Sequence, residues 1–299
     1  MIQFYSHGKL LLTGEYMVLK GAQALAVPTK MGQSLTFESN DSKNLKWESW
    51  DHNHQLWFNA TLNLSDFGII DTDDKSVAQR LVQLLKIIRT HKKDFLGATG
   101  GKVMTRLEFD RQWGLGSSST LISNLAQWSQ VDPYILLRDS FGGSGYDIAC
   151  ANAKSPLVFK RDSLETSIEP CRFNPPFKSN LYFVYLNQKK NSREAINQFK
   201  QLKITPQQIN QSSEFTQAML KTDSLREFDE ILYEHEKFTG RILGQQPVKE
   251  RLFNDHNGAI KSLGAWGGDF VLATGNHNTP KYFKNKGFNT VIAYAEMLL

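Results

Sequence analysis

The sequence predicts a two-domain α+β protein, and three observations support this prediction. The chain has 299 residues, 40% of them apolar and 11% aromatic, which is enough for one large hydrophobic core or two ordinary ones. Expected strands and helices are mixed along the chain rather than strictly alternating, which favours α+β over a doubly wound parallel sheet. The pattern also resets around residues 174–176, Asn-Pro-Pro, which indicates a linker.

The first half of the chain is rich in short apolar or alternating runs, which are typical of β-strands. Residues 33–38 alternate between apolar and polar side chains, as a half-buried strand does. Residues 103–109 also read as a strand, and a glycine-serine turn follows at once. The expected strands in this half are 9–13, 16–19, 24–27, 33–38, 45–48 and 103–109.

Two helices are expected between these strands. The first has apolar residues on one face between Val77 and Ile88, with Ser76 as its N-cap and basic residues at its C-terminal end. The second has helical spacing over 121–128. Beyond the expected linker we predict a strand at 181–186, a mostly helical stretch to about Leu243, and strands at 270–273 and 290–294.

Charge and composition exclude several classes of protein. The net charge is +5, but lysines and arginines are scattered among acids with no run of about five like charges, so no nucleic-acid partner is expected. A small anionic substrate suits the same surplus. No stretch approaches the ~18 consecutive apolar residues of a membrane helix, and the first residues lack the features of a signal peptide. The two cysteines, Cys150 and Cys171, are too few for a disulfide scaffold, so we expect a cytoplasmic protein without a membrane partner. The sequence leaves the oligomeric state open between monomer and homodimer.

The sharpest motif is a glycine-serine segment between an expected strand and an expected helix. Glycines let the backbone approach a ligand closely, and a helix N-terminus attracts a polyanion such as a nucleotide phosphate. This is not the Walker A pattern, because no lysine follows the second glycine. The alternative is an ordinary glycine turn with serine capping. The segment consists of Gly114, Leu115, Gly116, Ser117, Ser118 and Ser119.

Three further segments carry candidate chemistry. Asp147 follows a glycine cluster at 142–145 and precedes small residues, so it is either a fixed anion that orients or deprotonates a hydroxyl, or a simple N-cap. Lys9, before an apolar run, is either a partner for a transferring phosphoryl group or a strand-end lysine that extends into water. Residues 264–269, Gly-Ala-Trp-Gly-Gly-Asp, form a tight turn unless they lie over a ligand.

Taken in order, residues 8–16, 114–118, 145–147 and 264–269 resemble the motifs of the GHMP kinases. This superfamily is named for galactokinase, homoserine kinase, mevalonate kinase and phosphomevalonate kinase. The resemblance spans nearly the whole chain and implies the two-domain GHMP kinase fold, with ATP and Mg²⁺ as cofactors. It implies an N-terminal ribosomal-protein-S5-like nucleotide-binding domain over 1–170 and a C-terminal ferredoxin-like domain over 171–299, with the active site between them.

The resemblance also implies roles for individual residues. Asp147 and Lys9 match the catalytic pair, in which the aspartate acts on the acceptor hydroxyl and the lysine lies near the γ-phosphate. Ser118 matches a serine near magnesium. Residues implied to bind ATP are Gly114, Leu115, Gly116, Ser117, Ser118, Ser119, Gly264, Gly267 and Gly268, and those implied to bind substrate are Glu15, Tyr16, Ser144 and Gly145.

The branch of the superfamily follows from finer features. Tyr16 stands where mevalonate kinases usually have histidine, and residues 143–149 look more like phosphomevalonate kinases, so mevalonate or phosphomevalonate is the expected acceptor. A diphosphomevalonate decarboxylase-like enzyme and a non-catalytic nucleotide-binding regulator are the alternatives.

Three positions depart from the superfamily's pattern. Trp113 precedes the glycine-serine segment where many members have a small residue, and Trp266 replaces a usual glycine. Leu136 falls where mevalonate kinases have a magnesium-binding glutamate, with Asp132 and Asp139 as nearby acids.

Overall fold

The computed structural model describes residues 1–97, 99–161, 166–189, 192–264 and 266–299. The chain divides into two compact units, and strands β1 (Ile2–Leu11) and β2 (Ala24–Asn40) contribute residues to both. These units are defined by compactness and do not test the predicted division into domains at 1–170 and 171–299, which stays a prediction. Unit 1 contains Met1–Gly8, Met31–Arg111 and Leu115–Asn152, and unit 2 contains Lys9–Lys30, Gln112–Gly114 and Ala153–Leu299.

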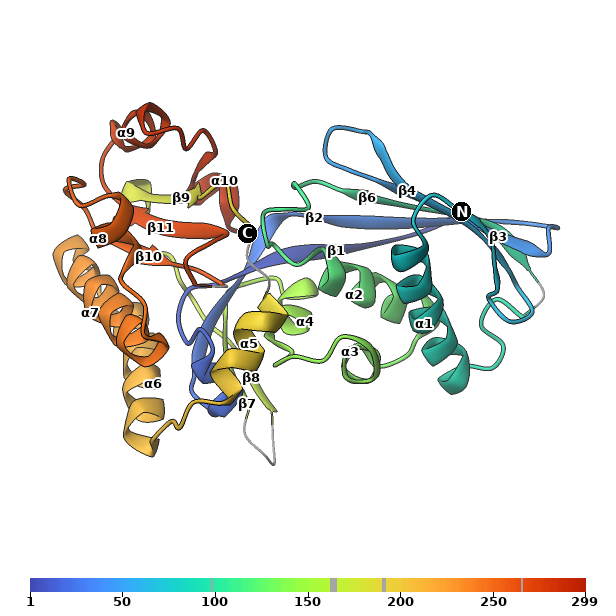
Figure 1. Ribbon diagram of the computed structural model, residues 1–299, viewed down its shortest axis with the longest axis horizontal. Coiled ribbons are helices and arrows are strands. Elements are labelled where there is room, and N and C mark those ends of the chain that lie inside the picture. The colour runs from blue at the N-terminus through green and yellow to red at the C-terminus, as the bar shows by residue number, and fades with distance from the viewer. Residues whose placement is uncertain (98, 162–165, 190–191, 265) are drawn as a thin grey trace. The chain divides into compact units, whose positions relative to one another are not determined.

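Unit 1 is a mixed sheet with helices on one face (Figure 1). The order of its strands is β5-β4-β3-β6-β2, in which β3 and β6 are parallel and the other pairs are antiparallel. Its further strands are β3 (Asn44–Trp50), β4 (Leu56–Asn63), β5 (Ile69–Thr72) and β6 (Gly100–Leu107), and its helices are α1 (Lys75–His91), α2 (Ser117–Ser129), α3 (Pro133–Ser140) and α4 (Tyr146–Ala151).

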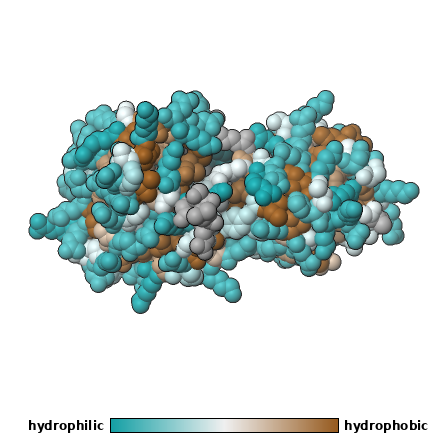
Figure 2. Space-filling model, turned by 90° about the horizontal axis from the view of Figure 1, so that it is seen from below, coloured by the Kyte–Doolittle hydropathy of each residue, from teal (hydrophilic) through white to brown (hydrophobic). Residues whose placement is uncertain are grey.

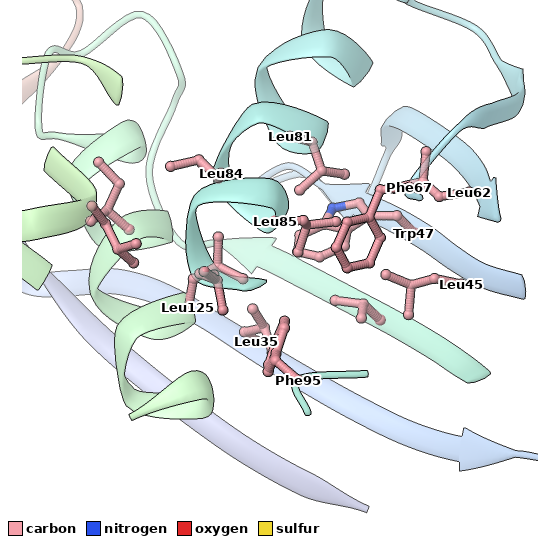
Figure 3. Close-up of a cluster of buried hydrophobic side chains, with 14 of the residues drawn as sticks. Leu35, Leu45, Trp47, Leu62, Phe67, Leu81, Leu84, Leu85, Phe95 and Leu125 are labelled. Carbon is pink, nitrogen blue, oxygen red and sulfur yellow. The ribbon is translucent and has the colours of Figure 1, made fainter. Parts of the chain in front are cut away.

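The core of unit 1 lies between this sheet and its helices (Figure 3). Trp47 of β3 and Leu85 of α1 are both buried there, which explains the apolar face predicted for the first helix. The N-cap of α1 is Asp74 rather than the predicted Ser76. Its Oδ1 accepts hydrogen bonds from the backbone N–H groups of Ser76 and Val77 at 2.9 and 3.1 Å.

Unit 2 contains a four-stranded antiparallel sheet in the order β10-β11-β9-β12. The helices after β9 and the helix after β11 complete a β-α-β-β-α-β sequence, which confirms the ferredoxin-like architecture. The strands are β9 (Leu181–Tyr185), β10 (Ile260–Ser262), β11 (Phe270–Thr274) and β12 (Val291–Ala293), and the helices are α5 (Ser192–Lys200), α6 (Pro206–Lys221), α7 (Leu225–Leu243), α8 (Val248–Leu252), α9 (Thr279–Asn285) and α10 (Tyr294–Met297).

The remaining elements of unit 2 are two strands and two short 3-10 helices. β7 pairs with β2, and β8 pairs with β7, both antiparallel. The bounds are β7 (Leu157–Arg161), β8 (Thr166–Pro170), η1 (Met17–Lys20) and η2 (Lys178–Asn180).

Two strand predictions in the first forty residues are corrected. Residues 16–19 do not form a strand but lie mostly in η1, because Tyr16 has a positive φ of 60° and turns the chain. The expected strands 24–27 and 33–38 are one strand, β2, which continues through Pro28. A proline fits there because Ala24–Ala26 pair with β7 and Gln33–Asn40 pair with β6, so Pro28 lies between the two pairings.

The expected linker at 174–176 is a packed part of unit 2. Phe173 and Phe177 on either side of it are buried, and their rings lie 6.3 and 5.0 Å from the ring of Phe228 in α7. The two prolines therefore mark a turn between packed aromatic anchors.

The face of the protein in Figure 2 is mostly hydrophilic, with hydrophobic residues gathered in patches between hydrophilic ones. Among the described helices, none combines the length and apolar character needed to cross a bilayer.

Candidate functional site

Lys9 lies near the end of β1, and unit 2 brings its side chain to the glycine-serine segment. The Lys9 Nζ donates a hydrogen bond to the carbonyl oxygen of Gly114 at 2.7 Å, and the side chain is half-buried. A lysine that only extends into water does not make such a contact. The structure therefore holds the ammonium group beside the start of this segment.

The glycine-serine segment has a left-handed backbone at both glycines. Gly114 has a φ of +67° and Gly116 a φ of +92°, values that residues with a Cβ rarely adopt. Gly116 is the N-cap of α2 and makes no side-chain capping bond. The N–H groups of the first turn of α2 are thus not capped by the N-cap residue, and such a helix start attracts anions.

The three serines after Gly116 have different environments. Ser119 is buried, and its Oγ donates a hydrogen bond to the carbonyl oxygen of Gly116 at 2.8 Å. Ser117 is half-buried and Ser118 is exposed, whereas Leu115 is buried and anchors the segment. Ser119 therefore stabilises the turn, whereas Ser118 lies at the surface.

The third glycine segment, residues 264–269, is the loop of the hairpin between β10 and β11 in unit 2. At its base the backbone N–H of Leu263 donates to the carbonyl oxygen of Phe270 at 3.0 Å. Gly264 and Gly267 have φ values of +66° and +82°, and Gly268 directly precedes Asp269. Ala265 lies outside the described residues.

Asp269 contacts both glycine segments. A Cβ built on Gly114 would lie 2.6 Å from the Asp269 Oδ2, and one built on Gly264 would lie 3.6 Å from the same oxygen. Asp269 itself has a positive φ of 52°, and its backbone is held by hydrogen bonds with Gln188 and Leu186 at 2.7 and 2.8 Å. Only glycine at 114 allows this close approach of the carboxylate.

The two tryptophans that depart from the superfamily's pattern are packing residues of unit 2. The Trp113 ring lies edge-on against Phe270, with centroids 5.7 Å apart. Trp266 is buried, and its backbone N–H donates to the Tyr16 Oη at 3.1 Å. Gly240 in α7 makes room for it, since a Cβ there would lie 3.2 Å from the indole. Trp113 therefore anchors the chain just before the glycine-serine segment, and Trp266 anchors the third glycine segment from within.

Asp147, Ser144 and Gly145 lie at the start of α4 in unit 1. Gly145 is the N-cap with a φ of +94°, and a Cβ there would lie 3.0 Å from the ring of Tyr134. Asp147 is half-buried in the first turn, and its Oδ1 accepts from the backbone N–H of Ile148 at 3.1 Å. Because Gly145 occupies the N-cap position, the alternative of N-capping by Asp147 is wrong. Ser144 is buried, and α4 packs against α2 within unit 1.

The residues near the magnesium-binding position of the superfamily have structural partners. Leu136 is fully buried in the core of unit 1. Asp132 caps α3 by accepting from the N–H of Tyr134 at 2.8 Å, and Asp139 pairs with Arg138 at 2.7 Å. Within the described part of the chain, no group of three or more His, Cys, Asp or Glu side chains could hold a metal ion. Ser118, the metal ligand that the resemblance implies, is an exposed residue.

A cluster of buried ionisable residues in unit 2 was not predicted from the sequence. The Lys261 Nζ donates to the Glu15 carboxylate, and both side chains are fully buried. His235 Nε2 lies 3.6 Å from the other Glu15 oxygen. Glu236 accepts from the N–H and Oγ of Ser262 at 2.9 and 2.8 Å. The signal in the sequence was Lys261 between Ile260 and Ser262, shortly before the third glycine segment.

Burial controls the protonation of this cluster. Loss of solvation raises the pKa of Glu15 to about 7, although the nearby Lys261 ammonium acts in the opposite direction. Burial likewise raises the pKa of Glu236. Burial, together with repulsion from Lys261, lowers the pKa of His235 well below its ordinary value. The three groups therefore favour a neutral histidine and a carboxyl group that takes up a proton near neutral pH.

Solved structures with the same fold include several small-molecule kinases. A mevalonate kinase matches with a TM-score of 0.72 and 16% identity over 97% of both chains. Phosphomevalonate kinase of Streptococcus pneumoniae, solved with phosphomevalonate and AMPPNP, matches with a TM-score of 0.70 and 16% identity over 98% of this chain and 100% of the other. Galactokinase of Lactococcus lactis, solved with galactose, matches with a TM-score of 0.69 and 12% identity over 99% and 93%.

The chain therefore has the fold of the GHMP kinases over nearly its whole length, as the sequence motifs predicted. No family model and no curated protein matches it in sequence. Unit 2 brings together Lys9, Gly114 and the third glycine segment, whereas unit 1 contains the serines of α2 and Asp147.

Proposed function

We propose that this protein is an ATP-dependent phosphotransferase that phosphorylates a small acceptor. The observation that carries the proposal is the convergence in unit 2, where the Lys9 ammonium binds Gly114 at 2.7 Å and Asp269 of the third glycine segment packs against the same glycine. Three motifs far apart in the sequence thus meet at the start of a segment with the geometry of an anion site. A turn with only a structural role does not require this convergence.

Phosphoryl transfer depends mainly on positioning and neutralisation of charge, and these residues supply both. The uncapped N–H groups at the start of α2 would bind the nucleotide phosphates, and the left-handed glycines 114 and 116 allow the backbone to approach them. Lys9 would neutralise charge that develops on the transferring group. Asp147 would accept the proton of the acceptor hydroxyl or orient it.

Magnesium would arrive with the nucleotide. Mg²⁺ prefers oxygen ligands and is often held by one or two protein groups together with substrate phosphates and water. The exposed hydroxyl of Ser118 supplies one such neutral oxygen. This donor set suits an ion that the nucleotide carries, and does not suit a permanently bound one. When bound, the ion would neutralise charge on the phosphates.

The acceptor that we propose is mevalonate or phosphomevalonate. The resemblance of residues 143–149, and of the acid at position 269, to phosphomevalonate kinases favours the phosphorylated acceptor. The surplus of positive charge, +5, also suits an anionic substrate. The proposed substrate-side residues are Glu15, Tyr16, Ser144 and Gly145, of which Glu15 acts through its buried contacts rather than as an exposed ligand.

The test is an ADP-release assay with MgATP and mevalonate, 5-phosphomevalonate or galactose as acceptor. We expect turnover with one of the first two. Asp147→Asn should lower kcat by about 100- to 10,000-fold, the contribution of a general base, while leaving ATP binding nearly intact. Asp139→Asn is the matched control, because Asp139 is an exposed aspartate of the same unit that forms a salt bridge with Arg138. Full turnover in Asp147→Asn would contradict the assigned role.

Two other outcomes would identify the alternatives. Release of carbon dioxide from diphosphomevalonate, with consumption of ATP, would indicate a decarboxylase-like enzyme. ATP binding without ADP release on any acceptor would indicate a non-catalytic regulator.

A further inference from the structure

The turn that follows β1 is bound to the third glycine segment at two neighbouring residues. The carboxylate of Glu15 accepts from the Nζ of Lys261, which lies in the strand that leads into the third glycine segment. The hydroxyl of Tyr16 accepts from the backbone N–H of Trp266, within that segment. We call these four residues the clamp. All four belong to unit 2.

The turn held by the clamp is strained. Tyr16 has a φ of 60° and a ψ of −40°, a conformation that costs a non-glycine residue on the order of 1–3 kcal/mol. Gly14 has a φ of +80°, and a Cβ there would lie 2.7 Å from that of Ala24. Such a turn persists only if surrounding contacts determine it, and the clamp supplies contacts at both residues after Gly14.

The buried pair of Lys261 and Glu15 in the clamp is not explained by stability alone. Lys261 and Glu15 are both fully buried, and one Glu15 oxygen has no hydrogen-bond partner in the described part of the chain. The free energy lost when two charges are removed from water offsets much of their electrostatic attraction. A well-packed apolar pair at the same position therefore often gives a protein that is at least as stable. The placement of the pair argues for a different role. Glu15 follows the strand that holds Lys9, and Lys261 precedes the segment that holds Asp269, so the pair joins the two parts of the chain whose residues contact Gly114.

We propose that Lys261 and Glu15 are positioning residues of the phosphoryl-transfer site. The pair fixes the third glycine segment so that Asp269 stays against Gly114, and it keeps the strained turn after β1 in the same arrangement. This inference rests on the proposed function for its effect on turnover, whereas its effect on the third glycine segment is independent of that function.

The test uses three variants of the full chain. Lys261→Met removes the ammonium group and leaves Glu15 buried without its cation, so it can also destabilise the fold. The double variant Lys261→Met with Glu15→Gln removes both charges and should restore much of the lost thermal stability. The Lys261 Nζ donates to the backbone carbonyl of Ser262 at 2.9 Å as well as to Glu15. Lys249→Met is the matched control, since Lys249 is a lysine of unit 2 whose Nζ donates to the backbone carbonyl of Gly258 at 2.7 Å.

The decisive measurement is the comparison of stability with kcat and KM for ATP in the double variant. We expect Tm to return close to that of the wild type while kcat/KM for ATP stays about 100-fold reduced, because small displacements of positioning groups cost roughly that much. The control should retain wild-type values. Recovery of activity together with stability would show that the pair has only a structural role and would overturn the proposal.

Amide hydrogen exchange keeps the inference testable if the protein transfers no phosphate. The N–H of Trp266 should exchange roughly tenfold faster in the double variant, while the amides of β11 keep their protection. Unchanged exchange at Trp266 would overturn the positioning role. Faster exchange without turnover in the wild type would overturn the proposed function and leave the positioning role intact.

Discussion

The glycine motifs of unit 1 begin helices that rest on an apolar core, whereas those of unit 2 are joined by buried charges. In unit 1, Leu125 of α2, Leu136 of α3 and Ile148 of α4 belong to one buried apolar cluster. In unit 2, Glu15 and Lys261 connect the turn after β1 to the third glycine segment. The stability that apolar packing provides does not depend on pH, whereas buried carboxyl groups and histidines change their protonation state with pH. The comparison therefore predicts that pH affects the connection between the motifs of unit 2.

The largest effect is expected at Gly114, where unit 2 tolerates no side chain. Gly114→Ala would place a Cβ 2.6 Å from the Asp269 Oδ2, at a backbone φ of +67°. Either the carboxylate or the turn must move, and we expect kcat/KM for ATP to fall about 100-fold. Steady-state kinetics at varied ATP concentration measures this.

Gly287→Ala is the matched control for Gly114→Ala. Gly287 also has a positive φ, +89°, but nothing lies within 4 Å of a Cβ there. This variant carries the backbone strain without the contact, so it should lose stability of about 1 kcal/mol and keep its kinetics. Equal kinetic losses in the two variants would show that the Asp269 contact is unimportant.

A second effect is the pH dependence of unit 2. Glu15 has a raised pKa of about 7 against 4.5 when unfolded, so the folded state holds an extra proton in that window and stability falls as pH rises through it. His235 has a lowered pKa, so the unfolded state binds the extra proton and stability falls as pH drops below 6.5. The two slopes oppose each other in the wild type.

Single variants should separate these slopes. Relative to the wild type, Glu15→Gln should gain stability as pH rises from about 4.5 to about 7, and His235→Gln should gain stability as pH falls below 6.5. Urea unfolding at several pH values measures both. If the two variants shift in the same direction, the protonation states assigned to the cluster are wrong.

The smallest effect concerns the first helix of unit 1, which carries no proposed function. Asp74→Ala should cost about 1 kcal/mol of stability, because Asp74 accepts from two backbone N–H groups at the start of α1. Ser76→Ala should cost only a few tenths of a kcal/mol of stability, since Ser76 is exposed in the first turn. Denaturant titration of both variants distinguishes the two residues, and an equal loss would contradict the cap at Asp74.

Much of the fold follows from local patterns in the sequence. Alternation at 33–38 and the apolar face between Val77 and Ile88 predicted elements that the structure confirms. The run at 16–19 was misassigned because four apolar residues do not distinguish a strand from a helical turn. Strand β4 was missed because its role depends on pairing with β3 rather than on its own pattern.

The candidate site could be predicted only in part. Glycines and serines at 114–119 predicted a phosphate-binding segment, and the structure places a left-handed glycine at the start of α2, as such a segment requires. The clamp could not be predicted in this way. Glu15 and Lys261 are 246 residues apart, and only the packed tertiary structure brings them together. Asp269 was noted in the sequence, but its contact with Gly114 required the fold of unit 2.

The most direct test of the account is phosphorus NMR of the protein with MgATP and 5-phosphomevalonate or mevalonate. The account predicts ADP together with a new resonance from a phosphorylated product, and neither should form with Asp147→Asn over the same period. Product formation that Asp147→Asn leaves unchanged, or the lack of product with every acceptor despite bound nucleotide, would contradict it.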